Sequence, residues 1–156
     1  MGRKGRVILA VACFLAAFLA WMRPAGATLG GQADSIEEDR RVLAASRVTV
    51  RPQNGYSIHE YSQDGTDIRE YISPSGIVFG IAWNGMTHPD LAQLLGSYYV
   101  KYTGALARTP RPVGQRRLMV KENDVVVEKW GHMRNLQGRT YAPGLLPPGV
   151  TLDDIK

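Results

Sequence analysis

The chain has 156 residues, a formal net charge of +5 and a single cysteine. This length is that of one ordinary domain able to bury a core. Four of the 19 basic residues and none of the 14 acidic ones fall in residues 1–27, so the remainder is nearly neutral. The basic balance therefore gives no argument for nucleic-acid binding. Cys13 also lies in that first segment, which excludes disulfides, thiolate nucleophiles and thiolate metal sites from residues 28–156.

Residues 1–27 have the three parts of a secretory signal peptide. Arg3, Lys4 and Arg6 form a basic start, residues 7–22 carry no charge, and Ala25-Gly26-Ala27 is a small-residue ending. A retained membrane anchor is the alternative, but spanning a bilayer takes about 20 apolar residues. We predict cleavage near Ala27, export to the periplasm or beyond, and no transmembrane segment in the mature protein.

The mature chain is expected to begin with a flexible segment at 28–31, followed by a short helix from Ser35 to about Ser46. Ser35 and Glu38 have the spacing of a capping box. Strands are then predicted at 56–62 and 66–72 around an Asp64-Gly65 turn, since Asp-Gly favours tight hairpins. A third strand at 77–83 is apolar on both faces, which predicts a position at the centre of a sheet.

The main helix is predicted to start at the N-cap Thr87 and to stop near Gly104. Its apolar residues recur at the spacing of one helical face: Leu91, Leu94, Leu95, Tyr98 and Tyr102. We expect this stripe to pack on the small-residue side of strand 77–83, at Gly80 and Ala82. Trp83 is expected to be at least partly buried.

Further strands are predicted at 118–120 and 125–130, joined by a turn at 122–124, with another at 132–136. Residues 142–156 form a Pro-rich tail, because proline lacks the N–H that helices and central strands need. The predicted fold is α+β: one domain over 28–156 with a curved antiparallel sheet of five or six strands, one long helix across a face and a short N-terminal helix.

No motif in the chain predicts catalysis. His59, His88 and His132 lack the spacing of a zinc site, and Gly-x-Ser-x-Gly is absent. Glu60 and Glu70 are placed to lie across the first hairpin, where solvent or Arg69 is the expected neighbour. We predict no cofactor and no metal.

Two features favour binding. Tyr99 falls off the apolar stripe and is a candidate contact for a protein or a sugar ring. The acid-free segment 101–121 carries six basic residues, among them the candidate ligand-binding residues Arg108, Arg111, Arg116 and Arg117. An anionic glycan or lipid headgroup is the ligand this segment would take.

Three hypotheses follow. The first is a non-enzymatic envelope accessory protein that binds another envelope protein. The second is a binder of anionic glycan or lipid through segment 101–121. The third is a small hydrolase with a site near His132, Arg134 and Arg139.

Several segments together resemble one family of exported bacterial proteins, the family of domain of unknown function 2844. They are residues 27–31, 69–79, 82–85, 89–91, 94–96, 131–134, 138–141 and 145–150. The resemblance covers nearly the whole mature chain. It implies an exported bacterial protein, and it brings no established activity, cofactor or catalytic residue.

Overall fold

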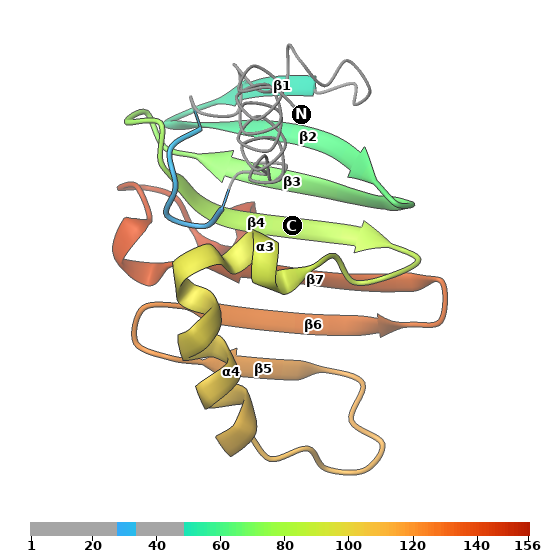
Figure 1. Ribbon diagram of the computed structural model, residues 1–156. Helices are drawn as coiled ribbons and strands as arrows, with labels where there is room; N and C mark the ends of the chain where they lie inside the picture. Colours follow the sequence, from blue (N-terminus) through green and yellow to red (C-terminus); the bar gives the residue numbers. More distant parts are fainter. Residues whose placement is uncertain (1–27, 34–48) are drawn as a thin grey trace, which may run out of the picture.

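The computed structural model describes residues 28–33 and 49–156. Their core is one open, fully antiparallel sheet in the order β1-β2-β3-β4-β7-β6-β5 (Figure 1). The strands are β1 (Thr49–Gln53), β2 (Tyr56–Gln63), β3 (Thr66–Ile72), β4 (Val78–Gly85), β5 (Leu118–Lys121), β6 (Val126–His132) and β7 (Asn135–Tyr141). The α+β class is confirmed, with seven strands instead of five or six. The predicted signal peptide and the helix at 35–46 lie outside the described residues.

Local sequence determines the first hairpin and the central strand as predicted. Asp64 and Gly65 adopt φ values of 50° and 75°, the left-handed pair that a tight hairpin needs. Every residue of β4 from Val78 to Trp83 is buried, and β4 has three strands on either side. The continuous apolar run therefore marks the middle of the sheet, where both faces are covered.

Two strands differ from the sequence-based expectation. β1 was not predicted, because all five of its side chains are exposed and Pro52 weakens the strand pattern. β7 runs through Gly138 to Tyr141, where the sequence indicated an end before that glycine. A Cβ on Gly138 would lie 2.2 Å from Cζ2 of Trp83, so the glycine is needed for the indole to lie against the strand.

The predicted helix is divided in two. Asp90, and not Thr87, caps α3 (Leu91–Leu95), and its carboxylate accepts from the Ala92 N–H at 2.8 Å. Gly96 then adopts a φ of +50°, a 3-10 turn follows over Gly96–Tyr98, and α4 (Tyr99–Arg108) continues past the predicted stop at Gly104. The positive φ of Gly96 breaks the helical path that the apolar spacing suggested.

The helices cover one side of the sheet, here called the front face (Figure 1). Leu94, Leu95 and Tyr102 are buried there against Ile81 and Trp83, while Leu91 and Tyr98 are partly buried. Burial of the stripe and of Trp83 is confirmed. The expected partner is wrong: the stripe packs on the large residues of β4, because a bulge near Phe79 turns Gly80 and Ala82 to the other side.

The opposite side, the back face, is covered over part of its area by the tail. A Cβ on Gly80 would lie 3.0 Å from Cδ1 of Ile155, and Ile155 is fully buried. Ile155 belongs to a second apolar cluster with Tyr71, Phe79 and Tyr141. Two 3-10 turns, Pro143–Leu145 and Leu152–Asp154, shape the tail, so the Pro-rich segment is packed structure.

Residues 28–33 are also packed, in contrast to the flexible start that the sequence suggested. Leu29 is 2 % exposed and its N–H donates to the Leu94 carbonyl at 2.8 Å. Gly30 and Gly31 exchange two backbone hydrogen bonds with Val78. The glycines permit this close approach, since a Cβ on Gly30 would lie 3.0 Å from the Tyr98 ring.

Candidate functional site

A row of charged side chains crosses the back face perpendicular to the strands. From β1 toward β5 the row reads Arg51, Glu60, Arg69, Ala82, Arg139, Glu128 and Arg117. Counted outward from Ala82, the residue types on each side are arginine, glutamate and arginine. Glu60 and Arg69, and Glu128 and Arg139, are cross-strand register partners, and opposite charges in such positions stabilise a strand pair. Arg51 of β1 and Arg117, just before β5, reach these glutamates diagonally, because the register partners of the glutamates there are Thr49 and Met119. We call these residues the charged row.

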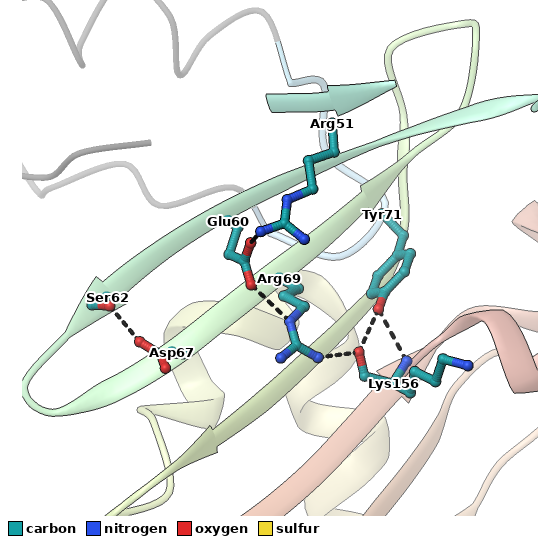
Figure 2. Close-up of polar contacts among 7 residues, drawn as sticks. All are labelled: Arg51, Glu60, Ser62, Asp67, Arg69, Tyr71 and Lys156. Carbon is teal, nitrogen blue, oxygen red and sulfur yellow. Dashed lines mark hydrogen bonds and ion pairs between the residues drawn. The ribbon is translucent and has the colours of Figure 1, made fainter. Parts of the chain in front are cut away.

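The half of the row on β1, β2 and β3 is partly solvent-exposed, and Figure 2 shows its contacts. Glu60 accepts from Arg51 at 3.0 Å through one carboxylate oxygen and from Arg69 at 3.0 Å through the other. The prediction that Glu60 faces Arg69 is confirmed. Exposed pairs of this kind contribute about 0–1 kcal/mol each, so they orient side chains more than they stabilise the fold.

The other half of the row is more deeply buried. The Glu128 side chain is 3 % exposed, and its Oε2 accepts from Arg117 at 2.8 Å and from Arg139 at 3.2 Å. Arg139 also donates to the backbone oxygens of Leu152 and Ile155, at 2.6 Å and 3.2 Å. Arg139 therefore joins the buried carboxylate to the tail.

The end of the tail lies between the two arginines that flank Ala82. The Tyr71 hydroxyl donates to the Lys156 backbone oxygen at 2.7 Å and accepts from the Lys156 N–H at 3.0 Å (Figure 2). Arg69 donates to the same backbone oxygen. Burial raises the pKa of Tyr71, so its hydroxyl stays protonated and remains a donor at neutral pH.

A second row on the back face runs parallel to the charged row. On each strand it lies two residues away from the charged row, toward the end of the sheet that holds the β2–β3 and β6–β7 turns. It consists of Ser62, Asp67, Asn84, Gln137 and Trp130, which are register partners in that order. Ser62, Asp67 and Asn84 are exposed, and Gln137 and Trp130 are half-buried. We call this set the polar row.

Hydrogen bonds fix the two ends of the polar row. Ser62 donates to Asp67, and the Trp130 indole N–H donates to the Gln137 Oε1 at 3.1 Å. The polar row thus presents oriented donors and acceptors across five strands on a rigid sheet. Such a surface suits recognition of a macromolecule.

Three of the basic residues in segment 101–121 are paired with acids. Lys101 pairs with Asp124, Arg108 with Glu122 at 3.0 Å, and Arg117 with Glu128. The Lys101 pair raises the pKa of that amine through its hydrogen bond to Asp124. Arg111 and Arg116 are exposed and appear in no ion pair of the described residues. This pairing was missed from the sequence because the acids come from other segments, Glu122 and Asp124 from the β5–β6 turn and Glu128 from β6.

The residues of the hydrolase hypothesis do not converge. His132 and Arg134 are exposed at the β6–β7 turn, where Arg134 adopts a φ of +65°. Arg139 of β7 lies opposite Glu128, whereas the residue opposite His132 is Asn135, four residues away from Arg139 along β7. Tyr99 is 36 % exposed on α4, tilted against the Tyr102 ring at 6.2 Å, as an off-stripe residue should be.

A buried polar cluster on the front face was not anticipated. Glu70 is fully buried, accepts from the Tyr61 hydroxyl at 2.9 Å and lies opposite His59, which is 8 % exposed. Glu60 and Glu70 therefore face opposite sides of the sheet, which excludes a joint acid–base pair. Alternation along β3 was the available signal, because Glu70 shares a face with Ile68 and Ile72.

Within residues 28–33 and 49–156, no group of three or more His, Cys, Asp or Glu side chains is arranged to hold a metal ion. No helix in those same segments is long and apolar enough to cross a membrane. The back face therefore presents hydrogen-bond donors and acceptors in fixed orientations, together with arginine–glutamate ion pairs.

Comparison with known families gives one match. The family model described as "Protein of unknown function (DUF2844)" matches residues 25–155. No curated protein and no solved structure matches the chain. The matched range includes residues 28–33, the sheet, the helices and the tail up to Ile155.

Proposed function

The chain belongs to the family described as protein of unknown function (DUF2844), and we propose that it is an exported, non-enzymatic accessory protein that binds another protein of the bacterial envelope. The back face is the proposed binding surface. Because the family description names no activity, we infer the function from the surface chemistry of the chain.

The polar row is the observation that carries this proposal. Its members run side by side over five strands, and Ser62, Asp67 and Asn84 are exposed. Protein interfaces combine such polar groups with aromatic residues, and Trp130 supplies a half-buried indole at one end. The charged row next to it fixes the neighbouring arginines, so partner binding would need little ordering of the surface.

The tail defines how much of the back face is available. Residues up to Lys156 occupy the area around Tyr71, Phe79 and Gly80. The polar row lies beyond that area. A partner is therefore expected to contact the polar row and the exposed edge of the charged row without displacing the tail.

Site-specific photocrosslinking in the envelope tests this proposal. A photoreactive residue at Asn84 should give one discrete adduct with a protein, and the same residue at exposed Ala107 on α4 should not. Trp130→Ala should reduce the Asn84 adduct by about tenfold, the effect of losing a contact of about 1.4 kcal/mol. Equal adducts from both positions, or an adduct unaffected by Trp130→Ala, would contradict a specific back-face partner.

A further inference from the structure

A small open pocket lies on the front face at the end of the sheet where β4 leaves for α3. It has a volume of about 220 Å³ and its lining includes His88, Gln115, Arg116, Leu118, Lys129 and Leu136. His88 comes from the β4–α3 loop, Gln115 and Arg116 from the loop before β5, and Lys129 from β6. Segments distant in sequence thus bring nitrogen-bearing side chains together.

Positive charge in this pocket is not balanced by acid. Arg116 and Lys129 line it, and no carboxylate of the described residues does. Neither cation forms an ion pair among those residues, whereas Arg108 and Arg117 of the same basic segment each pair with a glutamate. The register partners of Lys129 are Leu118 and Gly138, so the adjacent strands supply no acid on this face.

Lys129 and His88 are each held by an aromatic side chain. The Lys129 ammonium lies 5.9 Å from the centre of the Tyr102 ring, within the range of a cation–π contact. The Trp83 indole N–H donates to the His88 Nδ1 at 3.0 Å. Because Nδ1 accepts this bond, neutral His88 carries its proton on Nε2 and has one N–H left to donate.

The charge state of His88 agrees with a positive local field. Burial lowers the pKa of His88 below its ordinary value of 6.5, and the nearby Lys129 cation lowers it further. The imidazole is therefore neutral at neutral pH. A negatively charged group placed beside Lys129 would offset that cation and move the His88 pKa upward.

We propose that this pocket binds a small oxyanion of the phosphate type. Arg116 and Lys129 provide the charge, and His88 and Gln115 provide uncharged N–H donors. Leu118 and Leu136 form apolar sides that exclude water from part of the pocket and so strengthen the charged hydrogen bonds. Trp130 of the polar row also lines the pocket, so the pocket adjoins one end of the proposed protein-binding surface, whereas Lys129 and Leu118 lie on the front face.

Isothermal titration with inorganic phosphate at low salt provides the first test. Arg116→Gln and Lys129→Gln should each weaken binding at least tenfold, which corresponds to about 1.4 kcal/mol for one charge-assisted contact. Arg111→Gln is the matched control, since it removes the same charge from the same exposed loop outside the pocket, and it should leave affinity within about twofold. Absence of phosphate binding, or equal loss in all three variants, would overturn the proposal.

Histidine NMR gives a second readout. Saturating phosphate should raise the pKa of His88. The Trp83 indole N–H signal should shift with the His88 titration, because protonation of Nδ1 breaks their hydrogen bond. An unchanged His88 pKa at saturating phosphate would place the anion elsewhere and contradict the assignment.

Vesicles distinguish a free from a lipid-borne phosphate. Vesicles of phosphatidylglycerol that bind the wild type, fail to bind Arg116→Gln and release the protein on adding inorganic phosphate would assign the pocket to a headgroup. Phosphate binding without vesicle binding would assign it to a soluble phosphate. Vesicle binding that phosphate does not displace would contradict the pocket as the anion site.

Discussion

Two buried threonines of the sheet differ in how their hydroxyls are satisfied. Thr66 is 1 % exposed and donates to the Thr87 carbonyl at 3.0 Å. Thr140 is fully buried on the front face side of β7, and its hydroxyl has no hydrogen-bond partner among the described residues. A buried hydroxyl without a partner is destabilising, because the loss of water is not offset.

Thr140→Val should therefore raise the free energy of unfolding by about 1 kcal/mol, since it replaces the hydroxyl with a methyl of similar size. The matched Thr66→Val should lower it by about 0.5–1 kcal/mol, because it removes a hydrogen bond that is made. Urea unfolding followed by fluorescence measures both. Destabilisation by both variants to the same extent would show that the Thr140 hydroxyl contributes a bond.

Arg139 and Arg51 each pair with a glutamate of the charged row, but the two arginine side chains differ in burial. Arg139→Gln leaves the Glu128 carboxylate, which is 3 % exposed, with Arg117 alone, and it also frees two tail carbonyls. We expect a loss of about 3 kcal/mol in unfolding free energy, as for a broken buried pair. Arg51→Gln breaks an exposed pair and should cost less than about 1 kcal/mol. Equal losses in thermal or urea unfolding would contradict this ordering.

At the scale of elements, the bulge in β4 decides which layer covers which face. Ile72 pairs with Val78 and Tyr71 with Gly80, so Phe79 is the extra residue. This insertion reverses the side-chain alternation after Val78. Ile81 and Trp83 consequently face the helices, and Gly80 and Ala82 face the tail.

Leu94 joins α3 to both the sheet and residues 28–33. Its side chain is 4 % exposed in the front-face core, and its carbonyl accepts from the Leu29 N–H. Leu94→Ala should lower the unfolding free energy by about 2–5 kcal/mol, the range for a buried leucine that leaves a cavity. Val100→Ala on the exposed side of α4, where valine is 77 % exposed, is the control and should be nearly neutral. A near-neutral Leu94→Ala would contradict the packing of the helix on the sheet.

For the whole molecule, the packed residues 28–33 bear on the predicted processing site. Leu29 is buried, and the backbone of Leu29, Gly30 and Gly31 bonds to Leu94 and Val78. Cleavage after Ala27 would preserve every one of these contacts. Cleavage after Leu29 would remove a core residue.

Protein recovered from the envelope is therefore expected to begin at Thr28, as read by N-terminal sequencing and intact mass. Ala27→Arg should block processing and leave a longer precursor, because the peptidase needs a small residue there. Recovery of unprocessed wild-type protein, or of a chain that begins after Leu29, would contradict the predicted cleavage.

The sequence by itself determined the elements whose signals are local. The Asp64-Gly65 turn, the strands on either side of it and the central position of β4 depend on residue types within a few positions of one another. Burial of Leu94, Leu95 and Trp83 follows from spacing and hydrophobicity in the same way. The family resemblance was also available from the sequence.

Tertiary structure alone decided the face that each element covers and the surroundings of each charged residue. The bulge at Phe79, the break at Gly96 and the packing of Leu29 all depend on contacts between distant segments. Glu128 looks no different from Glu60 in the sequence, yet one carboxylate is buried between two arginines and the other is partly exposed. Long-range pairing sets the environment of a side chain, and local sequence carries little information about it. The charged row, the polar row and the pocket at His88 are consequences of strand order.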